Sequence, residues 1–367
     1  MLRGWELSAG DLEALALGAA ILGTGGGGNP YIGRLRATQL LKAGFRIRVL
    51  PFDQLEDADL VVAVGGIGAP VVGIEKFEKG DECYQAMRAV ERFSGKPVTA
   101  LISSEIGGSN AIEPLIAAAY AGLPVVDADG MGRAFPEVQM CTYLIYGLPG
   151  APAALADEKG NIAILSSVAD EYWLEKLART AAVDMGATAG FALAPMRGSD
   201  LKRTAVPHTL SLALKLGRLV LQARSRHLDP VSQVAGETGA QLLFEGKIQD
   251  VSRRVVKGFA RGRVEIDGLR DFQRSRLTVD IQNENLVARR DGEVIASVPD
   301  LIMILDLETG EPITTELLRF GFRVAVLGLA APEQLRTARA LEVVGPRAFG
   351  YDLPYRPLGG GGWYAEH

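Results

Sequence analysis

The sequence predicts an α/β fold followed by a β-rich part, and two observations support this. In the first half of the 367 residues, short apolar segments alternate with helical segments, which is typical of parallel βαβ units. From residue 242 onward, segments of alternating polar and apolar residues are separated by Asp-Gly and Glu-Thr-Gly turns, which indicate an antiparallel barrel or sandwich. We expect the boundary between the two parts to lie between residues 165 and 230.

The first element is a helix over residues 9–22, which Ser8 caps and which ends at the glycine run 23–28. In the α/β part, strands are then expected at residues 45–50, 58–63, 97–103 and 123–126, and helices at about 81–93 and 112–121. The later part is expected to hold helices at about 168–185 and 209–226, and strands at 263–266, 276–281, 286–289, 294–298 and 323–327.

The composition is that of an ordinary globular protein, with 48% hydrophobic residues, 23% charged residues and a formal net charge of -5. This balance predicts no nucleic-acid partner. Glu6, Asp11 and Glu13 interrupt the region that a signal peptide would keep uncharged, and no apolar run approaches the roughly twenty residues of a membrane span. We therefore expect a cytoplasmic protein without membrane association. Cys83 and Cys141 are too few and too far apart for a disulfide framework or a cysteine-paired zinc motif.

A cluster of ionisable residues follows the expected strand 123–126. Period-two alternation places Asp127 and Asp129 on one side of its carboxyl end, and Arg133 and Glu137 follow closely. Because doubly wound sheets bind ligands beyond the carboxyl ends of their strands, we predict that these four residues are catalytic. The structural alternative is turn chemistry, with Asp129 as a helix cap and Arg133 as the partner that neutralises a buried Asp127.

The segment after strand 97–103 supplies further candidates. Glu105 joins the predicted catalytic set, and Gly107, Gly108 and Asn110 form part of a predicted substrate-binding set. Consecutive parallel strands often lie side by side, so these residues are expected on the same rim as the cluster above. The structural alternatives are a buried glutamate paired with Arg133 and an asparagine that caps the next helix.

Thr24, Gly25, Gly26 and Gly27 complete the predicted substrate-binding set. A glycine loop beside a helix end lets the backbone approach an anionic ligand closely. The loop lacks the Lys-Ser/Thr pair of a Walker motif, and it follows a helix rather than a strand, so the dinucleotide fingerprint is not met. A tight turn is the structural alternative.

Cys141, His208 and a divalent metal are further candidates to which the sequence assigns no role in the site. Cys141 lies in an apolar segment with no histidine near it in sequence, which favours a buried helix residue over a nucleophile. His208 precedes a helix and is expected to be a local cap. A cofactor is not predicted, but a divalent metal held by carboxylates stays open, with magnesium or manganese better suited than zinc.

Several motifs resemble those of the S-methyl thiohydantoin desulfurase family. The central ones are E-I-G-G-S-N at residues 105–110 and P-V-V-D-A-D-G-M-G-R-A-F-P-E at residues 124–137. Shorter matches are G-T-G-G-G at 23–27, A-D-E-K-G at 156–160, P-D-L-I at 299–302 and G-P-R-A-F-G at 345–350. The resemblance covers nearly the whole chain, and its central motif is long and specific.

The resemblance implies a three-layer α/β/α sandwich with a mostly parallel sheet over residues 1–167, followed by residues 168–367, in which about 242–367 are β-rich. It also implies a hydrolase that releases a thiol from a small hydantoin-like or S-methyl thiohydantoin-like ring. In such a reaction Asp127, Asp129 and Glu137 would transfer protons, while Arg133 would stabilise an anionic ring or a substrate carboxylate.

The substrate is expected to be a small molecule, and other functions stay open. The chain could bind a nucleotide or phosphorylated ligand, or it could be a noncatalytic subunit of a hydantoinase or oxoprolinase assembly. A homo-oligomer is also left open. Residues 242–327 are expected to form a wall of the pocket rather than to supply catalytic groups, with Asp306 as the alternative because it ends an apolar run.

Overall fold

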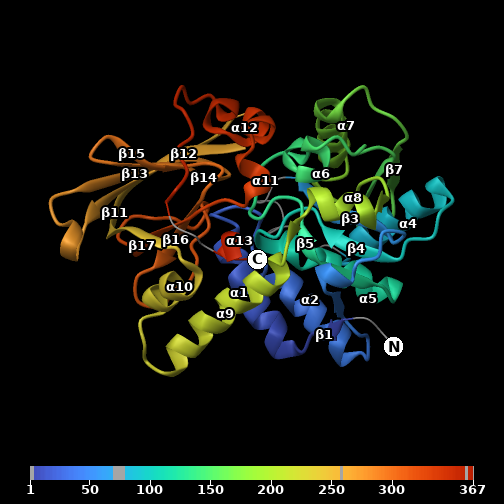
Figure 1. Cartoon of the computed structure of the whole chain (residues 1–367), viewed down its shortest axis with the longest axis horizontal. Coiled ribbons are helices and arrows are strands. Elements are labelled where there is room, and N and C mark those ends of the chain that lie inside the picture. The colour runs from blue at the N-terminus through green and yellow to red at the C-terminus, as the bar shows by residue number, and fades with distance from the viewer. Residues whose placement is uncertain (1–3, 69–78, 257–258, 360–362, 367) are drawn as a thin grey trace.

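A computed structural model describes residues 4–68, 79–256, 259–359 and 363–366. Figure 1 shows two sheets side by side, a mixed sheet with helices on the right and an antiparallel sheet on the left. The expected combination of an α/β part and a β-rich part is therefore confirmed.

The first sheet is parallel only at its centre. The four central strands pair in parallel, and in spatial order they are β2 (Arg48–Leu50), β5 (Pro124–Asp129), β4 (Ala100–Ser103) and β3 (Leu60–Gly68). Antiparallel strands flank them: β1 (Trp5–Glu6), β8 (Thr188–Ala192), β6 (Ala153–Ala156) and β7 (Ile162–Leu165), with β9 (Met196–Arg197) on β3 and β10 (Val206–Pro207) on β5. The βαβ periodicity thus predicted the centre, whereas the flanking strands make the sheet mixed.

Both faces of this sheet are buried, because alternate residues of its strands pack in opposite directions. Val62 and Val64 of β3 belong to one core cluster, and Val61 and Ala63 belong to another. The first cluster also includes helices α1 (Ala9–Leu22), α2 (Tyr31–Lys42), α4 (Glu82–Ser94), α5 (Glu113–Ala121), α9 (Thr209–Ser225) and α10 (Pro230–Thr238). The second includes α6 (Thr142–Ile145), α7 (Glu171–Asp184), α8 (Gly198–Thr204), α11 (Glu333–Arg336) and α12 (Ala338–Val344). Two helical layers on one sheet give the expected sandwich.

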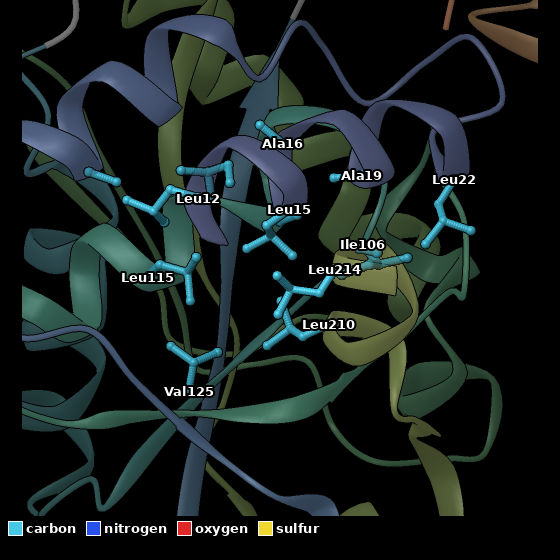
Figure 2. Close-up of a cluster of buried hydrophobic side chains, with 14 of the residues drawn as sticks. Leu12, Leu15, Ala16, Ala19, Leu22, Ile106, Leu115, Val125, Leu210 and Leu214 are labelled. Carbon is cyan, nitrogen blue, oxygen red and sulfur yellow. The ribbon is translucent and has the colours of Figure 1, made fainter. Parts of the chain in front are cut away.

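Helices α1 and α9 cross in close contact against the sheet. Figure 2 shows Leu12 and Leu15 of α1 near Leu210 and Leu214 of α9, above Val125 of β5. A Cβ at Gly18 would lie 2.6 Å from the carbonyl carbon of Ala213, and one at Gly217 would lie 2.5 Å from that of Ala14. This reciprocal glycine contact lets the two backbones touch, so α9 packs with the first sheet although it follows residue 167.

The second sheet has seven strands, and all of its neighbours pair antiparallel. Its spatial order is β15 (Glu293–Ser297), β14 (Glu284–Arg290), β13 (Arg276–Gln282), β12 (Phe259–Gly268), β11 (Gln241–Val256), β17 (Arg323–Leu329) and β16 (Leu301–Asp306). The sheet curls into a half-barrel around its own apolar core. Its strands include all five that the alternation predicted.

The helices expected at about 81–93, 112–121, 168–185 and 209–226 are present as α4, α5, α7 and α9. Helices α2 and α10 were not predicted, because α2 contains Gly33 and carries only a few buried residues, while α10 is short. A short helix α13 (Trp363–Glu366) ends the described chain. Within the residues that the structure describes, no helix is long and apolar enough to cross a membrane.

Candidate functional site

A cavity of about 650 Å³ lies where the two sheets meet. The carboxyl ends of β3 and β4, the first turns of α2 and α4, and strand β8 form one side, and the β13–β14 turn forms another. Four of the residues that the sequence predicted for the site line this cavity: Gly27, Glu105, Asn110 and Glu137. The cavity is thus at the carboxyl ends of neighbouring parallel strands, where doubly wound sheets bind ligands.

Glu105 lies just beyond β4 and is buried, with 7% of its surface exposed. Asn110 Nδ2 donates a hydrogen bond to its Oε1, and the N–H of Phe135 donates to its Oε2 over 3.0 Å. Loss of water on burial raises the pKa of Glu105 to about 7, although these two donors and the charge of Arg133 act in the opposite direction. A carboxyl with a pKa near 7 is suited to take up a proton at neutral pH.

Glu284 reaches the cavity from the turn between β13 and β14, where Asn283 adopts a left-handed φ of 57°. Its side chain is buried, and its Oε2 has no hydrogen-bond partner among the described residues. Burial and the nearby Glu105 raise the pKa of Glu284 well above its ordinary value, whereas Arg133 lowers it. This environment favours the protonated form of Glu284, which can donate a proton.

Glu137 and Cys141 also line the cavity. Gln139 Nε2 donates a hydrogen bond to the carboxylate of Glu137, and burial raises the pKa of Glu137, assisted by the charge of Glu175. Burial also raises the pKa of the Cys141 thiol well above its ordinary value. Cys141 therefore favours the neutral thiol, and it lies just before α6 rather than within a helix.

Arg133 does not line the cavity, contrary to the prediction from sequence. It is fully buried, and its guanidinium donates to Thr24 Oγ1 (2.8 Å) and to the carbonyl oxygens of Asn285 (3.1 Å) and Asp300 (2.8 Å). It also stacks on the ring of Phe135. A guanidinium has five N–H donors, so it can donate hydrogen bonds to carbonyl groups from two parts of the chain that are distant in sequence. Arg133 therefore joins the two sheets instead of facing a ligand.

Asp129 also lies outside the cavity lining, because its carboxylate is used by the backbone. It is fully buried and accepts hydrogen bonds from the N–H groups of Ile106 (2.7 Å), Met131 (3.0 Å) and Gly132 (2.9 Å). Burial raises the pKa of Asp129 to about 7, with these donors acting in the opposite direction. The Asp-Gly sequence thus forms a turn that ties β5 to the segment after β4, which was the structural alternative.

Asp127 caps a helix from outside it and, contrary to the prediction that it lines the pocket, does not line this cavity. Its carboxylate accepts from the N–H of Ser211 (3.0 Å) and from Ser211 Oγ (2.6 Å) in the first turn of α9. His208, the residue before α9, lies with its Nδ1 3.8 Å from Asp127 Oδ2, and this contact raises its pKa. Asp127 thus satisfies donors of the first turn of α9, where N–H groups lack partners within the helix, and the His208 side chain contacts Asp127.

The remaining predicted substrate-binding residues do not line the cavity but pack behind the residues that do. Thr24 and Gly25 offer their carbonyl oxygens to the N–H groups of Asn285 and Thr315, both 2.8 Å away. A Cβ at Gly26 would collide with Glu284. Gly107 and Gly108 pack against Ala134 and the glycine run 23–28, respectively. Thr24, Gly25, Gly26, Gly107 and Gly108 are therefore close-packing positions behind the cavity, which glycine makes possible.

The described residues include no group of three or more His, Cys, Asp or Glu side chains placed to hold a metal ion. Asp306, the alternative site residue of the β-rich part, accepts from the N–H groups of Glu308 (3.1 Å) and Thr309 (2.8 Å) in an exposed turn. Asn283, Glu284 and Leu317 are the residues through which the β-rich part forms a wall. Sequence reasoning missed Glu284, since Asn-Glu-Asn between two alternating segments also fits an exposed turn.

The comparisons with known proteins cover nearly the whole length of the chain. A model of the S-Me-THD-like N-terminal domain matches residues 10–167, and a model of the S-Me-THD-like C-terminal domain matches residues 169–358. None of the curated proteins matches the sequence. The fold is similar to the X-ray crystal structure of a protein from Chromobacterium violaceum, with a TM-score of 0.80 and 27% identity over 96% of this chain and 99% of that chain. Because the two matched domains follow each other along nearly all of the sequence, the chain belongs to the S-Me-THD-like family.

Proposed function

We propose that the chain is a hydrolase that removes the methylthio group from an S-methyl thiohydantoin-like ring in the cavity between the two sheets. The observation that carries the proposal is the pair of buried carboxyl groups on this cavity, Glu105 with a pKa of about 7 and Glu284 with a pKa well above its ordinary value. Two neighbouring acids whose environments shift their pKa values can serve as base and acid in one reaction. The family name supports the choice of ring.

The proposed reaction begins with attack of water on the ring carbon that bears sulfur. The Glu105 carboxylate takes one proton from the water as the new C–O bond forms, and the electron pair of the ring C=N bond moves to nitrogen. Ser104 Oγ, which lines the cavity and has no hydrogen-bond partner among the described residues, can donate to the ring as this negative charge develops.

The second step breaks the C–S bond. Glu284 donates its proton to the departing sulfur, so methanethiol leaves as a neutral molecule, and the new hydroxyl becomes the carbonyl of a hydantoin as its proton passes to the Glu284 carboxylate. The proton that Glu105 took from water passes to the ring nitrogen. Water and the methylthio ring are consumed, and hydantoin and methanethiol are formed. The two glutamates end in their starting states, as a catalyst requires.

The test is methanethiol release by the purified single chain from a 2-methylthio-imidazolone, measured with a chromogenic disulfide that reacts with thiols. We expect turnover by the wild-type chain and a loss of about 100-fold or more in Glu105→Gln and in Glu284→Gln, the range typical of a lost general acid or base. Glu293→Gln is the matched control, because Glu293 is an exposed glutamate on β15. Activity of the single chain would also exclude a purely noncatalytic role.

Two outcomes would contradict the proposal. One is a folded wild-type chain that releases no methanethiol, and the other is full turnover by Glu105→Gln. Circular dichroism of each variant separates a lost catalytic group from a lost fold.

A further inference from the structure

The cavity is lined by an excess of acidic side chains. Among the described residues, six glutamates and two arginines line it, and no aspartate, lysine or histidine does. The glutamates are Glu82, Glu105, Glu113, Glu137, Glu158 and Glu284. A low-dielectric cleft lined by one sign of charge concentrates its field on whatever enters it.

The two lining arginines are held by carboxylates. Arg36 Nη2 lies 2.5 Å from Glu113 Oε1, and Arg179 forms an ion pair with Glu175 while its Nη2 donates to the carbonyl oxygen of Pro136 over 2.9 Å. Arg133, behind the cavity, is occupied by carbonyl groups of both sheets. These three arginines are therefore already engaged, while Arg261, whose charge lowers the pKa of Glu137, does not line the cavity.

The carboxylate of Glu137 opposes an incoming anion. Burial and the charge of Glu175 raise the pKa of Glu137, while the charges of Arg179 and Arg261 lower it. Because Glu175 Oε2 accepts from the N–H of Val138 over 2.9 Å, two carboxyl groups lie at this wall, and a further negative charge there is unfavourable. Glu284 presents a buried Oε2 that has no partner among the described residues and that a ligand N–H can reach without competing with a hydrogen bond.

The cavity also has room and apolar surface for a large substituent. Its volume of about 650 Å³ is in the range of sites for drug-sized ligands and exceeds the needs of a single five-membered ring. Tyr31, Ile32, Phe135, Phe191 and Leu317 supply apolar wall. A substrate with a sizeable apolar stem on the ring therefore fits better than a bare ring.

Resting on the proposed function, we infer that the substrates of this site are S-methyl thiohydantoins whose ring side chain is large and either neutral or cationic, and that a carboxylate on that side chain is rejected. Glu137 is the specificity-determining residue of this discrimination, because its half-buried carboxylate lines the cavity and Glu175 accepts a hydrogen bond from the neighbouring N–H of Val138.

The test compares two nearly isosteric substrates, the S-methyl thiohydantoins built on glutamine and on glutamate. We expect kcat/KM for the glutamine compound to exceed that for the glutamate compound by about tenfold or more, since like charges juxtaposed at a site are strongly unfavourable. The compound built on lysine should be used at least as well as the glutamine compound. In Glu137→Gln the ratio of kcat/KM between the glutamine and glutamate compounds should decrease, while in the exposed control Glu293→Gln this ratio should not change.

Equal or better use of the glutamate compound by the wild-type chain would overturn the inference, as would an unchanged ratio in Glu137→Gln. Failure of the proposed function gives a different result, because then no compound is hydrolysed at all. In that case calorimetric binding of the same two compounds to the wild-type chain still measures the charge preference, and binding of neither compound, or equal binding of both, overturns the inference.

Discussion

A Cβ atom on Gly26 would stand 2.6 Å from the Cγ and Cδ of Glu284, far inside van der Waals contact. The glycine loop after α1 therefore provides space for the side chain of a glutamate from the other sheet. This contact explains why a glycine run near a helix end need not bind an anion. In this chain the absence of a side chain at Gly26 leaves room for the carboxyl group of Glu284 at the cavity wall.

Gly26→Ala should lower turnover by about 100-fold, because a displacement of the order of 1 Å at a catalytic group has an effect of this size. The control is Gly236→Ala in α10, where an added Cβ meets no atom within 4 Å. Because alanine favours a helix interior, the control should stabilise the protein by about 0.5–1 kcal/mol without changing activity. Steady-state kinetics and urea unfolding measure both effects. Full activity in Gly26→Ala would show that Glu284 is dispensable.

Asp129→Asn should lower the free energy of unfolding by about 1–3 kcal/mol and leave the activity of the folded fraction near that of the wild type. Asp129 Oδ2 accepts from Ile106, Met131 and Gly132, and Oδ1 also accepts from the N–H of Gly132 over 3.0 Å. In asparagine the NH2 group that replaces one of these oxygens would face backbone N–H donors. Denaturant unfolding and active-site-normalised kinetics check the two parts. An unchanged stability with lost turnover would return Asp129 to the catalytic set.

Arg133→Met should destabilise the protein by about 3–5 kcal/mol, the cost of breaking a buried, charged hydrogen-bond network. The carbonyl oxygens of Asn285 and Asp300 would lose their donor at the contact between the sheets. Arg133→Lys keeps the charge but not the planar fork, so an intermediate loss is expected. Guanidinium unfolding of the three proteins gives the ranking. Equal stability of Arg133→Met and the wild type would contradict the role of Arg133 in joining the two sheets.

Asp127→Ala should lower stability by about 0.5–2 kcal/mol, as loss of a helix cap does. The first turn of α9 would lose the acceptor for Ser211 N–H and Oγ. Activity per folded molecule should not change, since Asp127 lies outside the cavity lining. Thermal unfolding together with methanethiol release provides the measurement, and a selective loss of activity would be the contrary result.

As the pH rises towards neutrality, the rate should increase and the free energy of unfolding should decrease. The rate should rise with pH through about 7, as Glu105 loses the proton that prevents it from acting as a base. Stability should fall over the window from about 4.5, the ordinary value, to about 7, because the folded protein binds a proton there that the unfolded chain has released. In Glu105→Gln this fall should be shallower, but not absent, since the raised pKa values of Asp129 and Glu284 act in the same sense. Unfolding free energies between pH 4.5 and 7.5 measure the difference, and parallel curves for both proteins would contradict the assignment.

Helices and strands that are marked by a local sequence pattern, such as a capping residue or a short apolar run, were predictable from the sequence. Helix α1 spans residues 9–22 as expected, because Ser8 and Asp11 form a capping box and Gly23 follows the last turn. The central strands were predictable because buried parallel strands are short apolar runs. Helix α2 and the antiparallel strands β6, β7 and β8 were not, since their place depends on the partners against which they pack.

For the candidate site, the sequence by itself determined where polar groups follow strand ends, which placed Glu105 and Asn110 at the cavity because β3, β4 and β5 are parallel neighbours. Only the tertiary structure decided which of these groups face the cavity. Asp127, Asp129 and Arg133 turn inward because backbone N–H and C=O groups from distant segments need their hydrogen bonds there. Glu284 becomes a site residue only when the second sheet folds against the first, a contact between residues far apart in the chain that no local pattern encodes.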